Sequence, residues 1–176
     1  MNATTLARPQ DAHEDWGDTT IESKSLRQVL GRYPTGVAIV TTRAADGRPV
    51  GLTINSFASL SLDPALVLWS LVHRSPNLAV FQGASHFAIS VLAAHHEALA
   101  SRFANPAVVD KFDQVGVREA AEGVPVIADA LATLVCAAEQ RHSAGDHELF
   151  IGRVLRIDRN DGAPLVFHGG RFAALA

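Results

Sequence analysis

The first regular hydrophobic pattern in the chain has helical spacing. It follows a polar, acidic stretch over residues 1–22. The apolar positions i, i+3, i+4 and i+7 are Leu26, Val29, Leu30 and Tyr33. This spacing is typical of one face of an amphipathic helix. Ser25 and Gln28 match a capping box near its start. Pro34 ends the helix, because the residue before a proline avoids the helical conformation.

Most other apolar residues occur in runs of strand length that are rich in β-branched side chains. Such runs, bounded by turn signals, predict strands. Asp46-Gly47 predicts a hairpin between the first two of them. About seven strands are expected, over residues 37–42, 50–60, 65–72, 86–91, 131–138, 149–157 and 165–167. Two short helices are expected over residues 76–81 and 94–103.

This order of elements favours a mainly β fold. The strands do not alternate with helices of about 10–15 residues, which argues against a doubly wound parallel sheet. A small antiparallel barrel with peripheral helices fits better. Some strands, such as 65–72, are apolar on both faces, so we expect a helix or a second subunit to cover the outer face. We therefore expect a homodimer of one domain, residues 23–176, preceded by a flexible leader over residues 1–22.

Composition narrows the class of protein. The 176 residues are 48% hydrophobic and 19% charged, as in ordinary globular domains. No apolar run approaches the about 18 residues that a membrane-spanning helix needs, and the acidic leader resembles neither a signal peptide nor a transit peptide. The net charge of −3 gives no general attraction to nucleic acid or anionic lipid. We expect a cytoplasmic protein without nucleic-acid or membrane partners.

Several well-known chemical motifs are absent from the sequence. It contains no Gly-x-Gly-x-x-Gly fingerprint, no P-loop and no Gly-x-Ser-x-Gly elbow. The single cysteine, Cys136, excludes an internal disulfide and lies in an apolar run, where we expect it to be buried. Trp69 is expected in the core for the same reason. His95 and His96 open a predicted helix, where neighbouring side chains diverge by about 100° and make a poor metal clamp. No metal site is expected.

The densest polar segment lies within the predicted strand 50–60. In a regular strand one face would carry Thr53, Asn55, Ser59 and Ser61, with Ser56 on the other face. Hydroxyl groups, a carboxamide and backbone N–H groups suit a phosphate and a polyhydroxyl chain. The alternative is an ordinary solvated strand face.

Two further clusters could carry chemistry. Arg74 and Ser75 precede a predicted helix whose first turn could bind an anion; alternatively, Ser75 caps that helix and Pro76 takes its first position. The triplet Gly145-Asp146-His147 lies between two predicted strands. It is either a plain hairpin turn or the place where a histidine reaches the mouth of a cleft.

Four segments taken in order resemble one known family. They cover residues 33–42, 51–64, 87–103 and the triplet 145–147, and the likeness spans about residues 25–175. The chain resembles the short-chain NAD(P)H:flavin reductases, the reductase components of two-component flavin-dependent monooxygenases. The resemblance implies the FMN-binding split-barrel fold, a small antiparallel Greek-key β-barrel with peripheral helices.

The resemblance also implies roles for individual residues. The isoalloxazine and ribityl chain of the flavin would contact Thr35, Gly36, Val37, Thr53, Ile54, Asn55, Ser56 and Ser59. The ribityl and phosphate groups would lie near Ser70, Arg74, Ser75, Asn77, Arg102 and Phe103. The nicotinamide nucleotide would contact Gly145, Asp146 and His147, and Phe172 would close over it. His147 would be the catalytic residue, next to the site of hydride transfer.

The implied activity is hydride transfer from NADH or NADPH to FMN or FAD. The reduced flavin would then diffuse to a partner monooxygenase. Three alternatives remain open at the level of sequence: a non-catalytic flavin- or haem-binding split barrel, an oxidase that uses pyridoxal phosphate, and a dimeric scaffold without a ligand. The choice between FMN and FAD, and between NADH and NADPH, also remains open.

Overall fold

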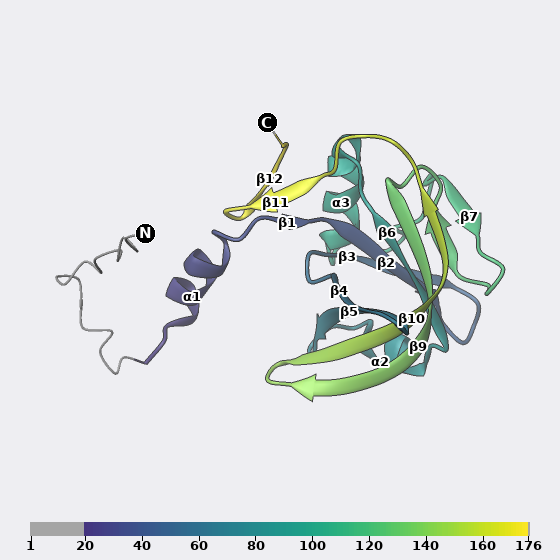
Figure 1. Ribbon diagram of the computed structural model, residues 1–176, viewed down its shortest axis with the longest axis horizontal. Helices are drawn as coiled ribbons and strands as arrows, with labels where there is room; N and C mark the ends of the chain where they lie inside the picture. Colours follow the sequence, from purple (N-terminus) through teal and green to yellow (C-terminus); the bar gives the residue numbers. More distant parts are fainter. Residues whose placement is uncertain (1–19, 176) are drawn as a thin grey trace, which may run out of the picture.

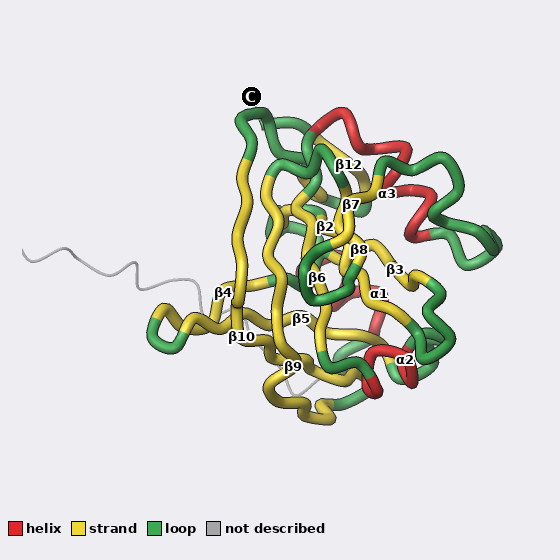
Figure 2. The backbone as a smooth tube through the Cα atoms, turned by 90° about the vertical axis from the view of Figure 1, so that its right-hand side faces the viewer, coloured by secondary structure: helices red, strands yellow, loops and turns green. Residues whose placement is uncertain are grey.

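The computed structural model describes residues 20–175, and their structure is mainly β (Figures 1 and 2). The helices are α1 (Ser23–Leu30), α2 (Leu78–Gly83), the 3₁₀ turn η1 (Ala94–His96) and α3 (Glu97–Ala104). The strands are β1 (Thr35–Gly36), β2 (Ala38–Arg43), β3 (Pro49–Ile54), β4 (Ala58–Leu62), β5 (Ala65–Val72), β6 (His86–Val91), β7 (Val117–Glu119), β8 (Pro125–Ile127), β9 (Ala132–Ala144), β10 (His147–Arg159), β11 (Val166–His168) and β12 (Arg171–Ala173).

Seven strands form one antiparallel sheet in the order β3-β2-β6-β9-β10-β5-β4. The strands β3 and β4 are separated by only three residues in the chain, yet they lie at opposite ends of this order. Residues 55–57 therefore connect the two edges of a strongly curved sheet, and β3 does not pair with β4 in the described part of the chain. Two small sheets, β1-β11-β12 and β7-β8, complete the fold.

An aromatic cluster fills the space enclosed by the curved sheet. Trp69 on β5 is fully buried and stacks on Phe150 of β10 with ring centroids 4.4 Å apart. Phe81 of α2 and Phe87 of β6 meet the same indole edge-on, at 5.0 Å and 5.8 Å. Offset and edge-on contacts of this kind suit the aromatic quadrupole. The expectation that Trp69 is a core residue is confirmed.

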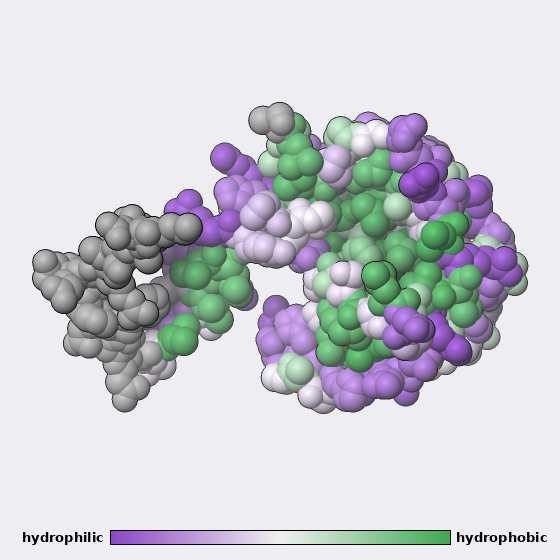
Figure 3. Space-filling model, in the orientation of Figure 1, coloured by the Kyte–Doolittle hydropathy of each residue, from purple (hydrophilic) through white to green (hydrophobic). Residues whose placement is uncertain are grey.

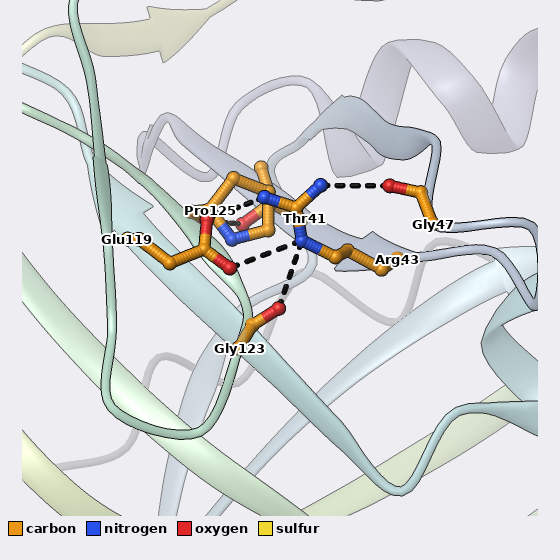
Figure 4. A network of polar contacts seen from close by, with 6 residues as sticks. All are labelled: Thr41, Arg43, Gly47, Glu119, Gly123 and Pro125. Atoms are coloured by element: carbon orange, nitrogen blue, oxygen red, sulfur yellow. Dashed lines mark hydrogen bonds and ion pairs between the residues drawn. The ribbon is translucent and has the colours of Figure 1, made fainter.

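A polar clamp fastens the small β7-β8 sheet to β2 (Figure 4). The Nε of Arg43 donates to a carboxylate oxygen of Glu119 and to the carbonyl of Gly123, each at 3.0 Å. Its Nη1 donates to the carbonyl of Gly47 at 2.7 Å, and its Nη2 pairs with the second oxygen of Glu119. Such a bidentate pair fixes geometry as well as contributing energy. One planar side chain thus joins the β2-β3 hairpin to the β7-β8 hairpin, which is remote in sequence.

The predicted antiparallel arrangement is confirmed, but several element boundaries are wrong. The single strand expected over 50–60 is two strands, because the chain turns at residues 55–57. The first helix begins two residues before Ser25, with Glu22 as N-cap and no side-chain cap, so the capping box does not form. The helix expected over 76–81 runs over 78–83. The four short strands β1, β7, β8 and β12 all lie outside the expected ranges.

Two further expectations concern the leader over residues 1–22 and membrane-spanning helices. Residues 1–19, most of the predicted leader, lie outside the described residues. Within the described range, 20–175, none of the helices has the length and apolar character needed to cross a membrane.

We predict that Gly152→Ala destabilises the protein by about 1–3 kcal/mol, the usual cost of overpacking a core. A Cβ at this position of β10 would lie 2.3 Å from Cζ of Phe87 and 3.0 Å from Cβ of Cys136, so the ring or the strand must move. Urea denaturation measures the change in the free energy of unfolding. Gly83→Ala is the matched control, because a Cβ there meets nothing within 4 Å. Equal stability of the two variants would contradict the close packing.

Candidate active site

One large groove lies between the edge strand β3, the end of β5 and the loop after α3. Its volume is about 1130 Å³, above the ~300–1,000 Å³ of ordinary small-molecule pockets. The walls are residues 48–53, 71–77 without residue 73, and 103–113 without residues 105 and 107. A groove of this size has room for more than one small ligand group.

Five residues that the sequence associates with a flavin line this groove: Thr53, Arg74, Ser75, Asn77 and Phe103. The hydroxyl of Thr53 donates to the carbonyl of Ala100 at 2.7 Å, which fixes its rotamer. These five residues combine hydroxyl and carboxamide groups with one cation and an aromatic ring, a donor set that suits a phosphate and a polyhydroxyl chain.

The alternative reading of the Arg74–Asn77 turn as a simple helix cap is wrong. Helix α2 begins at Leu78, with Asn77 as its N-cap, so Pro76 is not the first helical residue. The hydroxyl of Ser75 accepts the backbone N–H of Asn77 at 3.3 Å and belongs to the turn before the helix.

The triplet Gly145-Asp146-His147 forms the turn between β9 and β10 and lies beside the groove. His147 is paired with Val72 of β5, a groove residue, and the N–H of His73 donates to the carbonyl of Asp146 at 2.9 Å. The Nδ1 of His147 lies 2.7 Å from a carboxylate oxygen of Asp146. The hydrogen bond and charge of His147 lower the pKa of Asp146, helped by Arg74. Asp146 is therefore ionised near neutral pH and holds the Nδ1 proton, which leaves Nε2 of His147 for a ligand.

The segment after Thr53 is not one polar strand face, so the expectation of a shared face is wrong. Ile54 ends β3 and packs in the core, whereas Asn55 is exposed in the turn and Ser59 is exposed on β4. The hydroxyl of Ser56 donates to the carbonyl of Ser70 at 3.2 Å and accepts the N–H of Ser70 at 3.1 Å. This reciprocal pair ties the turn to β5, next to the groove.

Other predicted residues lie away from the groove walls. Thr35 and Gly36 form β1, which pairs with β11, and Val37 is buried in a second apolar cluster. Phe172 on β12 packs edge-on against Phe167, with ring centroids 5.7 Å apart. Arg102 lies behind the groove and donates to the carbonyl of Asp110 at 2.8 Å. None of these predicted residues lines the groove, although Val37 and Phe172 belong to the same apolar cluster as Phe103 of the groove wall.

The sequence reasoning missed two cations of the groove, Arg48 and Lys111. Arg48 stands one residue before β3, and Lys111 lies in the loop after α3. Neither belongs to a periodic pattern. Only the closeness of Lys111 to acidic and aromatic neighbours in Asp110-Lys111-Phe112 could have drawn attention to it.

Comparison with known proteins places the chain in a family. The model of the flavin reductase like domain matches residues 30–176. The chain belongs to this family. It is 46% identical over 150 residues to FMN reductase (NADH) SmoA of Agrobacterium fabrum, which covers 85% of this chain and 84% of that protein. It is 39% identical over 155 residues to the reductase component of the flavin-dependent trigonelline monooxygenase of Acinetobacter baylyi, covering 88% of this chain and half of that longer protein.

A solved structure of another flavin reductase-like protein has the same fold. The NADH:FAD oxidoreductase SgcE6 of Streptomyces globisporus, in complex with NAD and FAD fragments, superposes with a TM-score of 0.83 at 38% identity. The likeness covers 90% of this chain and 97% of that chain. The expected family is therefore confirmed.

A second polar cluster in this flavin reductase-like domain contains His95, His96 and Asp129. The two rings do not diverge as expected: their centroids are 4.0 Å apart, and their Nε2 atoms lie 3.5 Å and 3.1 Å from the carboxylate of Asp129. The Nδ1 of His96, however, accepts the N–H of Ala93 at 3.2 Å. The proton of a neutral His96 therefore sits on Nε2 and faces the carboxylate, whereas a metal on Nε2 would need it on Nδ1. This arrangement suits a histidine–carboxylate pair better than a metal.

We predict that Cys136 of this reductase-like domain does not react with thiol reagents near pH 8 unless the protein unfolds. The side chain is fully buried, and burial raises the pKa of its thiol to about 12, from 9.0. Only the thiolate is nucleophilic. Labelling with a chromogenic disulfide should be complete in urea and negligible without it; rapid labelling of the native protein would contradict this burial.

The same raised pKa of Cys136 has a consequence for stability. Between about pH 9 and 12 the unfolded chain ionises at this thiol while the folded chain does not. The contribution of this thiol to the free energy of unfolding is therefore fully present below about pH 9, and it is lost as the pH rises toward 12.

Proposed function

We propose that this chain is an NADH-dependent flavin reductase, which reduces FMN or FAD by hydride transfer. The observation that carries the proposal is the position of the Gly145-Asp146-His147 turn beside the groove, with His147 paired to Val72 of the groove wall. Family membership and the names of the NADH-dependent relatives support it. A flavin supplies the redox chemistry when it is bound.

The residues of the groove fit a flavin nucleotide. Arg74, Ser75 and Asn77 offer a cation, a hydroxyl and a carboxamide for the phosphate. Thr53, already held by Ala100, offers a fixed hydroxyl for the ribityl chain or the ring edge. Phe103 and Leu52 supply apolar wall for a planar ring system.

His147 orients the nicotinamide in this proposal. Asp146 holds its Nδ1 proton, so Nε2 presents a hydrogen-bonding atom in one direction. Hydride transfer needs the two rings to be stacked within about 3–3.5 Å, and a misplacement of about 1 Å can cost 10²-fold in rate. Ser56, through its reciprocal bonds with Ser70, keeps the neighbouring turn in place for the flavin.

The unpaired edges β3 and β4, linked by residues 55–57, support the finer assignment of the fold as a Greek-key split barrel.

We also propose that the reduced flavin leaves for a partner monooxygenase in the cytoplasm, because a related protein is the reductase component of such an enzyme. The flavin- or haem-binding alternative without catalysis would keep the groove but would not need the ordered Asp146–His147 pair.

The homodimer is also part of this proposal, and helix α1 carries it. Within residues 20–175 no residue of this helix is buried, and Leu26, Val29 and Leu30 are exposed. Figure 3 shows it as an apolar patch that stands apart from the rest of the molecule. An isolated helix of eight residues is marginal in water. In the proposed dimer the apolar side chains of α1 pack against a second copy of this chain, which exposes Leu60 and Leu62 on β4.

The reductase proposal predicts that His147→Ala slows hydride transfer by about 10²-fold, through loss of orientation, while flavin still binds. The experiment mixes protein and flavin anaerobically with NADH in a stopped-flow instrument and follows the bleaching of the flavin. Flavin binding is titrated separately by fluorescence.

The matched control for His147→Ala is His142→Ala. His142 is exposed on β9 of the same hairpin and does not line the groove. An unchanged rate in His147→Ala would remove the assigned role, and wild-type protein that binds flavin without oxidising NADH or NADPH would favour the non-catalytic alternative.

The dimer proposal predicts that Leu30→Glu yields a monomer, because a charge would be buried in the apolar contact. Size-exclusion chromatography with light scattering measures the mass. Gln28→Glu, on the polar positions of the same helix, is the control and should remain a dimer. A wild-type protein that is monomeric at micromolar concentration would contradict the proposal.

A further inference from the structure

The groove residues Arg74, Ser75 and Asn77 belong to one segment, residues 73–82, which runs from the end of β5 into α2. Its first five residues form turns outside any strand, and α2 itself has only six residues. A helix of this length is not stable in water without packing. The position of the three groove residues therefore depends on what holds the two ends of the segment.

A single carboxylate, that of Glu148 on β10, contacts both ends. Its Oε2 lies 3.5 Å from Nε2 of His73, and its Oε1 accepts a hydrogen bond from Nε2 of Gln82 at 3.4 Å. The side chain of Glu148 is only 13% exposed. Within residues 20–175 no lysine or arginine forms an ion pair with it. Its two oxygens are thus used to hold the segment rather than to neutralise a strong cation.

The β9-β10 hairpin holds the far end of the segment from a second side. The guanidinium of Arg141 on β9 donates to the carbonyl of Gln82. Such charge-assisted hydrogen bonds are roughly twice as strong as neutral ones. The main chain and the side chain of Gln82 are therefore both bound to this hairpin, through Arg141 and Glu148.

Glu148 follows His147 directly in β10, and consecutive side chains of a strand point to opposite faces. The backbone of the pair is fixed by β5, where Val72 and Leu71 lie opposite His147 and Glu148. The turn that presents His147 and the segment that presents Arg74 are thus anchored to the same two residues of one strand.

A nucleophilic role for this cluster is excluded by its geometry. The Oγ of Ser143 lies 3.4 Å from Nε2 of His73, the same nitrogen that faces Glu148. In a serine–histidine–acid relay the acid holds the opposite ring nitrogen from the hydroxyl. The contacts of Glu148 are therefore suited to holding His73 in place.

We propose that Glu148 is a positioning residue, which sets the place of the Arg74–Asn77 turn and thereby the affinity of the groove for the phosphate of a flavin nucleotide. It acts from outside, because neither Glu148 nor His73 lines the groove. The proposal rests on the proposed function, which assigns the phosphate to this turn.

The test compares Glu148→Ala and Glu148→Gln with Glu139→Gln. The carboxylate of Glu139 pairs with Arg153 in the same hairpin, at 3.3 Å, and does not line the groove. Thermal melting first establishes that each variant is folded. Fluorescence titration then gives Kd for FMN and for riboflavin, which is the same flavin without the phosphate.

We expect Glu148→Ala to raise the Kd of FMN by about fivefold, a usual cost of hydrogen bonds lost from a partly exposed charged group. The Kd of riboflavin should change by less than about twofold, whereas a general loss of structure would weaken both flavins alike. Glu148→Gln keeps the size of the side chain and a hydrogen-bonding group at both contacts, so its Kd values should stay within about twofold of the wild type, as should those of Glu139→Gln.

A double-mutant cycle tests whether His73 acts through Glu148. His73→Ala should weaken FMN by a smaller factor, and Glu148→Ala combined with His73→Ala should be no worse than Glu148→Ala alone, because both changes remove the same contact. If Glu148→Ala does not fold, His73→Ala and Gln82→Ala, which each remove one contact, provide the comparison of FMN with riboflavin.

Three results would overturn the role of Glu148: an unchanged Kd of FMN in Glu148→Ala, equal losses for FMN and riboflavin, or effects that multiply in the double variant. Each of them leaves the reductase proposal intact. Conversely, wild-type protein that binds FMN but does not oxidise NADH would remove the reductase proposal, while the comparison of FMN with riboflavin would still decide the role of Glu148.

Discussion

Strand β10 passes within contact distance of the ring of Phe87, and the arrangement of the sheet depends on that close approach. It is possible because residue 152 is a glycine, whose missing Cβ leaves room for the ring and for Cys136. Gly152 lies opposite Val67 of β5 and Ala138 of β9, and the pairing with β9 shifts register beside it. β10 can therefore bend here: its first half carries Phe150 into the aromatic cluster and leads back to the turn at Asp146, whereas the residues after Gly152 are mostly exposed.

This packing also holds the residues of the candidate site in place. His147 is the first residue of β10 and is held by strands on both sides, through Val72 of β5 and Ala144 of β9. Thr53 is fixed by α3 and Ser56 by β5, so hydrogen bonds to the scaffold place hydroxyl groups along one side of the groove. Residues positioned by strands keep their geometry better than residues on a free loop. The groove is thus mostly preformed, with the cations Arg48, Arg74 and Lys111 spread along it.

Local pattern was sufficient to predict most of the long elements but not their arrangement. The hairpin at Asp46-Gly47 and strands such as β5 and β6 follow from turn residues and apolar runs. The separation of β3 from β4 does not, because residues 50–60 have strand-like composition throughout and the turn at 55–57 is fixed by the Ser56–Ser70 bonds across the fold. The groove residues Thr53, Arg74 and Ser75 were found by their chemistry and by resemblance. Lys111, which also lines the groove, was missed because it lies in a loop that has no periodicity.

The pairing of β1 with β11 joins the beginning of the domain to its end. Thr35 lies opposite Phe167, and the N–H of Val37 donates to the carbonyl of Leu165 at 3.2 Å. During synthesis on the ribosome, Thr35 and Gly36 emerge long before Val166 and Phe167, the residues of β11 with which they pair. Contacts between such distant segments also slow folding, because a long loop must close before they form. The β1-β11 pair is therefore among the last contacts of the described residues to form, whereas β2, which follows β1, can already pair with β3.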